Sequence, residues 1–214
     1  MSGAMMNVKA GQGAVVSKVW NLPNILTYGR IAAVPLVAGL LLWNERADAL
    51  TGFGVETARW FALAIFVAAA VTDFFDGYLA RKWGQQSSLG KMLDPIADKV
   101  LVAVVLLVLC GDQILRGGHI WAAIIILARE VLVSGLREYL GQLRVSVPVT
   151  QIAKWKTTVQ LVAIGFLIAG PAGDTVLPGV TWVGIIGLWI AAGLTLYSGY
   201  DYFRAGLRHV VDGE

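Results

Sequence analysis

The sequence predicts an all-α integral membrane protein with six transmembrane helices and with both termini in the cytoplasm. Three observations support this fold class. Hydrophobic residues make up 57% of the 214 residues and charged residues only 14%, a balance more apolar and less charged than that of soluble domains. Six apolar runs reach about 20 residues, the length that crosses a bilayer as a helix. The basic residues gather on one side of these runs.

The apolar runs are predicted to be helices, because lipid cannot hydrogen-bond a free backbone and no alternating pattern points to a barrel. They are expected at about 24–43, 58–81, 93–111, 119–141, 152–170 and 180–203. The polar breaks between them read NERADALTGFGVET, KWGQQSSLGK, GDQILRGG, GQLRVSVPVTQ and GPAGDTVLPG. We expect a juxtamembrane segment at 1–20, a six-helix domain at 21–208 and a tail at 209–214.

Lysine and arginine orient the bundle, since cytoplasmic loops carry an excess of them. One side holds Lys9, Lys18, Arg30, Arg81, Lys82, Lys91, Arg144, Lys154, Lys156, Arg204 and Arg208. The other side holds Arg46, Arg59 and Arg116, among the acids Glu45, Asp48, Glu56, Asp112 and Asp174. Both termini are therefore expected in the cytoplasm. The net charge of +3 is too small to indicate a nucleic-acid partner.

Four aspartates lie where the second and third spans meet the predicted cytoplasmic boundary. Positions three or four apart share a face of a helix. Asp73 and Asp76 therefore form one stripe, and Asp94 and Asp98 form another. Two antiparallel helices joined by a short loop would bring these stripes face to face. Four converging carboxylates repel one another and could not all stay ionised unaided.

Small residues continue both stripes, with Gly77 and Ala80 on the second span and Gly90 on the third. They leave room for close helix packing or for the approach of a ligand. Oxygen ligands at this density are those that hard divalent cations such as Mg²⁺ or Mn²⁺ select. The stretch therefore predicts a metal site suited to binding phosphates and to displacement at phosphorus.

Two other interpretations remain open at this point. The acids could be solvated, cap helices or pair with Arg81, Lys91 and Lys99. They could also line the pathway of a cation channel or transporter, although a pathway predicts acids at the middle of the membrane. Acids in register with small residues at one membrane boundary favour the metal site.

Residues 73–98 read D-x-x-D-G-x-x-A-R-x₈-G-x₃-D-x₃-D. This pattern resembles the signature of the CDP-alcohol phosphotransferase family, six-helix membrane enzymes that make phospholipids. The resemblance implies that Asp73, Asp76, Asp94 and Asp98 hold one or two divalent ions on the pyrophosphate of a CDP-linked lipid. It also implies that Asp98 is the general base. Residues that would contact the CDP-linked lipid are Gly77, Ala80, Arg81, Gly90, Asn24 and Thr27.

A second set of charges indicates which alcohol accepts the lipid phosphate. LAREVLVSGLREYL and QIAKWKTTVQ supply Arg129, Arg137, Lys154 and Lys156. These side chains suit a pocket for an anionic acceptor, although the arginines could instead form a structural ladder with Glu130 and Glu138.

Together with NLPNILTYGRI, which also holds Arg30, both segments resemble family members that use CDP-diacylglycerol and glycerol 3-phosphate. Phosphatidylglycerol, inositol phosphate and serine remain alternative acceptors. The resemblance further implies that the protein is a homodimer. It also implies that the protein lies in the bacterial inner membrane, in contact with membrane lipids. Its active site would face the cytoplasm.

Overall fold

A computed structural model describes residues 22–43, 45–83, 88–142 and 151–211. Within these ranges the chain forms helices and no strand, which confirms the predicted all-α class. The long helices are α2 (Leu22–Leu41), α4 (Val55–Trp83), α5 (Ser88–Gly111), α6 (Ile120–Gln142), α7 (Gln151–Val176) and α8 (Val180–Val211). Each coincides with one of the predicted apolar runs. Two short elements, α3 (Glu45–Thr51) and the 3₁₀ turn η1 (Gly117–His119), lie in stretches that we expected to be loops.

Five helices, α2, α4, α6, α7 and α8, are long and apolar enough to cross a membrane. The remaining long helix, α5, carries Asp94, Asp98 and Lys99 in its first half. Large apolar side chains cover the outer surface of the bundle, among them Val131 at 71% exposed and Leu132 at 64% exposed. Such a surface is stable in contact with lipid tails, so the chain is a multi-pass membrane protein.

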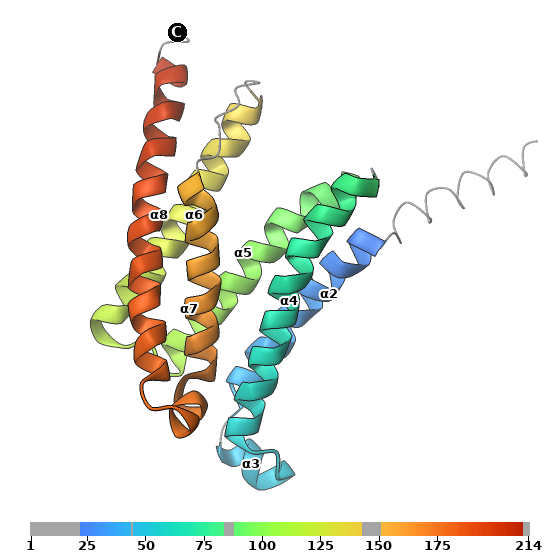
Figure 1. The fold of residues 1–214 in the computed structure, drawn as a ribbon, viewed down its shortest axis with the longest axis vertical. Helices are drawn as coiled ribbons and strands as arrows, with labels where there is room; N and C mark the ends of the chain where they lie inside the picture. Colours follow the sequence, from blue (N-terminus) through green and yellow to red (C-terminus); the bar gives the residue numbers. More distant parts are fainter. Residues whose placement is uncertain (1–21, 44, 84–87, 143–150, 212–214) are drawn as a thin grey trace, which may run out of the picture.

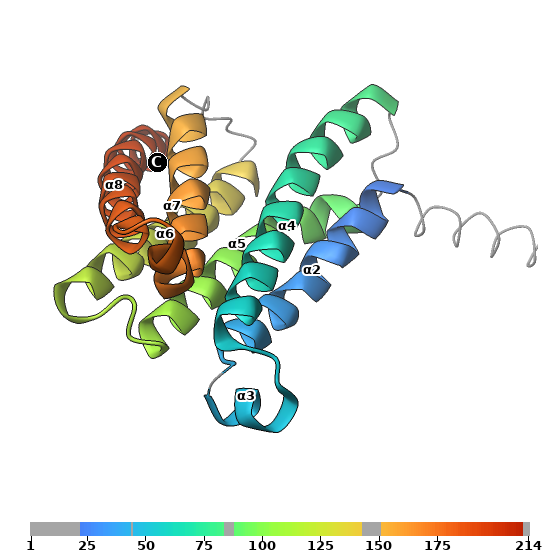
Figure 2. The ribbon, with the colours of Figure 1, turned by 60° about the horizontal axis from the view of Figure 1, so that its bottom comes forward.

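The helices are arranged as two groups with α5 between them (Figure 1). On one side α7 packs against α8, and α8 packs against α6; on the other side α2 packs against α4. α7 also contacts α4, and α2 also contacts α5, so the groups are joined. Seen from a second direction, α5 still crosses between the groups (Figure 2). The last turns of α4, α6 and α8 lie at the same end of the bundle, opposite α3 (Figure 1).

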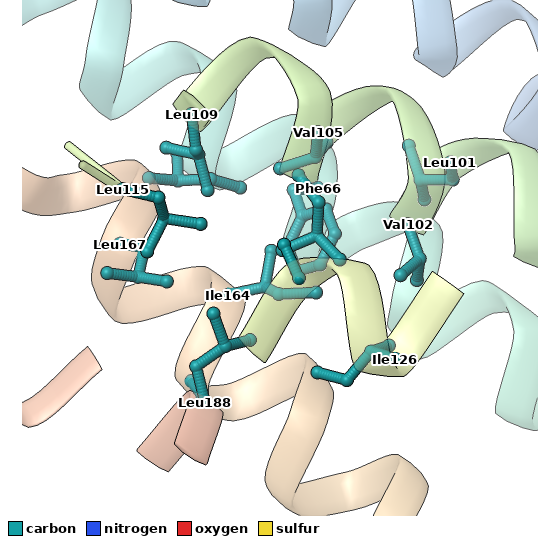
Figure 3. Close-up of a cluster of buried hydrophobic side chains, with 14 of the residues drawn as sticks. Phe66, Leu101, Val102, Val105, Leu109, Leu115, Ile126, Ile164, Leu167 and Leu188 are labelled. Atoms are coloured by element: carbon teal, nitrogen blue, oxygen red, sulfur yellow. The ribbon is translucent and has the colours of Figure 1, made fainter. Parts of the chain in front are cut away.

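The core of the bundle is built around α5. Val105, Leu106 and Leu109 are fully buried and belong to one cluster with Phe66 of α4 and Ile164 of α7. Figure 3 shows Val105 and Leu109 in this cluster. In a membrane, close packing of this kind stabilises helix contacts through dispersion, since lipid tails are as apolar as the side chains. The packing holds α5, which carries Asp94 and Asp98 nearer its start, between the groups.

The predicted break at GPAGDTVLPG is a kink followed by more helix. Gly170 has a positive φ of 42°, and the helix continues beyond Pro171 to Val176. A Cβ on Gly170 would lie 3.1 Å from Ile114 Cδ1, so the position needs glycine for its conformation and for its space. Pro171 has no N–H to donate, which removes a helical hydrogen bond and favours the bend at this point.

Arg59, which we counted among the basic residues of the side opposite the cytoplasm, is buried. It lies in α4, is only 6% exposed and forms an ion pair with Asp112, the residue that follows α5. Its guanidinium also donates to the carbonyl of Ile168, with 3.3 Å between Nη1 and the oxygen. Burial of a guanidinium is costly unless it is paired and hydrogen-bonded. Arg59 therefore ties α4, α5 and α7 together at the end far from the aspartates.

Candidate functional site

Two side chains of α2 contact the two aspartates of α5. Thr27 Oγ1 donates a hydrogen bond to Asp94 Oδ1. The guanidinium of Arg30 pairs with Asp98, with 2.6 Å between Nη1 and Oδ1. Thr27 and Arg30 lie three positions apart and so share one face of α2. Asp94 and Asp98 lie four positions apart and share one face of α5, so the two faces meet. The structure adds Arg30 as an ion-pair partner of Asp98. The pairing of these acids with Arg81 and Lys91 lies outside the described side chains and stays a prediction.

The α2 side of this contact is buried and the α5 side is partly open. Asn24, Thr27 and Arg30 are each 2% exposed or less. By contrast, 44% of the Asp98 side chain remains exposed. Asp98 is therefore held by a buried cation on one side while its carboxylate is accessible from another direction.

Several predicted site residues fall on side chains outside the described part of the structure. They are Asp73, Asp76, Gly77, Ala80 and Arg81 in the last turns of α4, Gly90 in the first turn of α5, and Lys154 in the first turn of α7. The facing of the two aspartate stripes thus stays a prediction. The described contacts add that α2 packs against both α4 and α5.

A metal ion would find suitable donors in the described half of the aspartate cluster. Among the described residues no three His, Cys, Asp or Glu side chains converge, and two of the four predicted ligands lie outside that part. Asp94 and Asp98 are one turn apart and partly exposed. They offer carboxylate oxygens, the ligands that hard divalent cations prefer. The donor set fits Mg²⁺ or Mn²⁺.

Glu130 of α6 is the centre of a buried charge cluster. Lys156 Nζ of α7 donates a hydrogen bond to Glu130 Oε1, and Arg129 Nη1 lies 3.3 Å from the same oxygen. Lys156 is only 5% exposed, and an unpaired cation so deep in a membrane bundle would be costly. One carboxylate cannot offset two cations, so this cluster keeps a surplus positive charge. The predicted ladder is therefore present at Glu130 and leaves charge for an anion.

Helix α8 holds Arg129 in place. Arg129 Nη2 donates to Ser198 Oγ at 3.1 Å. A Cβ on Gly199 would lie 3.0 Å from Arg129 Cγ and 3.2 Å from Nε, so the arginine stem lies in the space that glycine leaves. This close approach explains why residue 199 carries no side chain.

Arg137 is placed differently from Arg129. Its guanidinium carbon lies 5.7 Å from the centroid of the Tyr202 ring, which is a cation–π contact. Glu138, its alternative partner, is exposed. Within the described residues Arg137 forms no ion pair. The guanidinium therefore retains hydrogen-bond donors for an anion.

A cavity of about 310 Å³ joins the acid of α5 to these cations. It is lined by Pro95, Asp98, Lys99, Val102, Leu127, Arg129, Glu130, Arg137, Lys156, Thr157 and Gln160. The structure thus brings Asp98 together with Arg129, Arg137 and Lys156, from three helices. Asp94 is not part of this lining, nor are Asn24 and Thr27 of α2.

A larger hollow of about 470 Å³ lies between α4 and α7 and does not contribute to the site. Its walls consist of apolar side chains, among them Trp60, Phe66 and Phe166, and of glycines. With no titratable side chain in its walls, it offers no acid, base or phosphate ligand.

The sequence did not direct attention to Gln160, Ser198 or Gly199. Gln160 carried a usable signal, because it follows Lys156 by four residues and so shares its helix face. Ser198 and Gly199 carried none, since 69 residues separate Ser198 from the arginine that it contacts.

Comparison with known proteins identifies relatives over most of the chain. The family model described as CDP-alcohol phosphatidyltransferase matches residues 20–197. A Rickettsia bellii protein named CDP-diacylglycerol–glycerol-3-phosphate 3-phosphatidyltransferase is 46% identical over 189 residues, which cover 86% of this chain and 94% of the relative.

Two further relatives carry the same name. The protein from Cereibacter sphaeroides is 41% identical over 227 residues, covering 90% of this chain and 98% of the relative. The protein from Shigella flexneri serotype 5b is 38% identical over 203 residues, with the same coverage of 90% and 98%.

Proposed function

This chain belongs to the CDP-alcohol phosphatidyltransferase family, and from that premise we propose that it transfers a phosphatidyl group from CDP-diacylglycerol to glycerol 3-phosphate. The products are phosphatidylglycerophosphate and CMP, and the reaction is a step of phospholipid synthesis. Relatives named for this reaction are up to 46% identical to the chain.

The observation that carries the proposal is the shared cavity of Asp98 and the cations. An acceptor for this reaction needs a base at its hydroxyl and positive charge at its phosphate. Asp98 supplies a carboxylate on α5, while Arg129, Arg137 and Lys156 supply cations on α6 and α7. A volume of about 310 Å³ suits a small polar molecule, at the lower end of the range for ligand pockets.

The cations orient the acceptor by binding its phosphate. Arg129 is fixed by Ser198 and Glu130, and Lys156 by Glu130. Because these side chains are already ordered, little conformational entropy is lost when the phosphate binds. Holding the acceptor with its hydroxyl near Asp98 converts a bimolecular encounter into an oriented one, which lowers the barrier.

Asp98 then takes the proton of the primary hydroxyl as the general base. The hydroxyl oxygen attacks the phosphorus that bears the diacylglycerol group, and a new P–O bond forms. The bond from that phosphorus to the bridging pyrophosphate oxygen breaks, and CMP leaves with the electron pair. Arg30 holds the Asp98 carboxylate in position from the α2 side.

Members of this family generally use divalent metal ions. We propose that Asp73, Asp76, Asp94 and Asp98 hold one or two ions, Mg²⁺ or Mn²⁺, which offset charge on the pyrophosphate when bound. Thr27 orients the Asp94 carboxylate through its hydrogen bond. Nucleotide contacts are proposed for Gly77, Ala80, Arg81 and Gly90, and a place beside the CDP-linked lipid for Asn24 and Thr27.

The topology proposal follows the charge distribution. We place residues 21–208 in the inner membrane as a six-span domain, with α5 as the additional span, both termini cytoplasmic and the site facing the cytoplasm. A homodimer is expected from the family resemblance.

An acceptor assay tests the function. Purified protein in detergent with CDP-diacylglycerol, Mg²⁺ and labelled glycerol 3-phosphate should release CMP and label lipid, and EDTA should stop turnover until Mg²⁺ is restored. The comparison acceptors are phosphatidylglycerol, inositol phosphate and serine. Turnover with one of these and none with glycerol 3-phosphate would overturn the proposed acceptor. Turnover that is indifferent to EDTA would contradict the metal site.

A further inference from the structure

Gln160 of α7 is a buried polar side chain in the wall of the cavity that holds Asp98 and the cations. It is only 4% exposed. Its carboxamide oxygen, Oε1, has no hydrogen-bond partner among the described residues. A buried carbonyl oxygen without a partner costs free energy, and such groups in native proteins commonly await a ligand or water. None of the charged side chains described in the site donates a hydrogen bond to this oxygen.

The position of Gln160 relative to Lys156 suggests what its partner is. The two residues are four apart on α7, so they share a face and lie one turn apart, about 5.4 Å along the axis. Lys156 is bound to Glu130 on α6, and Gln160 lines the same cavity one turn further towards the α7–α8 connection. A molecule whose phosphate is bound at Lys156 and the arginines would therefore extend a neighbouring polar group to Gln160.

The carboxamide oxygen of Gln160 needs a hydrogen-bond donor, which a hydroxyl of the acceptor can supply. A carboxamide oxygen accepts a hydrogen bond and carries no charge, so it neither attracts a phosphate nor takes a proton at neutral pH. Glycerol 3-phosphate has a secondary hydroxyl beside the primary one that reacts. A site with only phosphate-binding cations and a base would also bind a simpler alcohol phosphate that lacks this second hydroxyl. Among the described residues that line the cavity, Gln160 Oε1 is the buried acceptor that has no hydrogen-bond partner.

We propose that Gln160 binds the secondary hydroxyl of the acceptor, the one that does not react, and thereby determines selectivity for a glycerol phosphate over a simple alcohol phosphate. The inference rests on the proposed function and specifies its acceptor site. When the acceptor is bound, its hydroxyl donates to Gln160 Oε1 and satisfies the buried oxygen. An acceptor without that hydroxyl leaves the oxygen unsatisfied, and such sites discriminate strongly against the analogue.

The test compares two acceptors in the wild-type protein and in Gln160→Met. 3-Hydroxypropyl phosphate keeps the phosphate and the primary hydroxyl of glycerol 3-phosphate and lacks the secondary hydroxyl. Wild-type protein should prefer glycerol 3-phosphate by about tenfold or more in kcat/KM, the expected effect of one unmade buried hydrogen bond. Gln160→Met keeps the side-chain length and removes the amide. It should lose about tenfold with glycerol 3-phosphate and nothing with the analogue, so that the preference disappears.

Thr195→Val is the matched control. Thr195 is fully buried, its Oγ1 also has no partner among the described residues, and it does not line the cavity. Its replacement should leave the ratio of kcat/KM for the two acceptors unchanged. Activity of Gln160→Met with the analogue shows that the variant is folded. If the variant fails to fold, Gln160→Leu, which also removes the amide, takes its place in the same comparison.

The outcomes separate this inference from the proposed function. Equal kcat/KM for the two acceptors in the wild-type protein, or an equal loss on both in Gln160→Met, overturns the hydroxyl contact while turnover with glycerol 3-phosphate upholds the function. An equal loss is also the result expected if Gln160 binds only an ordered water. Absence of turnover with glycerol 3-phosphate in the wild-type protein overturns the proposed function, and the acceptor contact with it.

Discussion

Arg30 of α2 and Asp98 of α5 form an ion pair across 68 residues of sequence, with 2.6 Å between Nη1 and Oδ1. The arginine side chain is 1% exposed and the aspartate side chain 44% exposed. The pair therefore joins a buried cation to a carboxylate that opens into the cavity of Arg129 and Lys156. This relationship connects the first helix of the domain to the proposed general base.

Replacement of the base should stop the reaction. We expect Asp98→Asn to lower kcat by about 100-fold to 10,000-fold, because an amide cannot take the proton of the acceptor hydroxyl. CMP release measures the effect, and the elution volume in detergent reports the fold. Asp48→Asn on α3, at the opposite end of the bundle, should behave like the wild type. Near-normal turnover in Asp98→Asn would refute the assignment of the base.

The ion pair itself can be tested with Arg30→Lys. A lysine keeps the charge but lacks the planar donors that align a carboxylate, so we expect kcat to fall about tenfold. The KM values of both substrates should stay near those of the wild type, because Arg30 acts through Asp98. Arg204→Lys, at an exposed position of α8, is the control. A large rise in either KM with unchanged kcat would assign Arg30 to substrate binding instead.

Loss of Arg137 should weaken binding of the acceptor selectively. In Arg137→Ala we expect the KM for glycerol 3-phosphate to rise about tenfold or more, since hydrogen bonds to charged groups contribute about 1.5–3 kcal/mol. The KM for CDP-diacylglycerol should change little. Glu138→Ala, at the exposed neighbouring position, should leave both constants unchanged. A similar rise for both substrates would favour a structural role for Arg137.

The space at Gly199 can be filled by one methyl group. In Gly199→Ala the new Cβ would lie 3.0 Å from Arg129 Cγ, so the arginine must shift away from Ser198. We expect the KM for glycerol 3-phosphate to rise several-fold, as initial-rate measurements would show. Gly193→Ala on the same helix meets nothing within 4 Å. It should keep wild-type kinetics and gain up to about 1 kcal/mol from helix propensity. Identical kinetics in the two variants would disprove the steric role of Gly199.

The ion pair of Arg59 and Asp112 should stabilise the fold without affecting the reaction. Arg59→Met leaves Asp112 without its guanidinium and Ile168 without a donor. We expect a loss of about 1–3 kcal/mol in unfolding free energy, seen as a lower Tm in detergent. Kinetics measured well below the Tm should match the wild type. Arg116→Met, at an exposed position, is the control. An unchanged Tm in Arg59→Met would show that the buried pair contributes nothing net.

Hydropathy was sufficient to locate each of the six long helices, because bilayer thickness and the need for internal backbone hydrogen bonds leave little choice. The start of α5 and the ends of α7 and α8 lie further out than the apolar runs. Hydropathy did not reveal α3, which is too short for a span, nor the continuation of α7 beyond Gly170. A glycine–proline pair indicates a break, and only packing against Ile114 and Arg59 shows that the chain bends there and remains helical.

For the candidate site, the sequence by itself determined the chemistry: the acids and cations, their spacing along each helix and hence the class of reaction. Spacing within one helix is a local property, since the helical repeat alone decides which residues share a face. The tertiary structure decided which faces meet. It paired Arg30 with Asp98, set Arg129 against Ser198 and Gly199, and turned Gln160 towards the cavity. These contacts join residues tens of positions apart, and they depend on the packing of whole helices around α5, which no local pattern encodes.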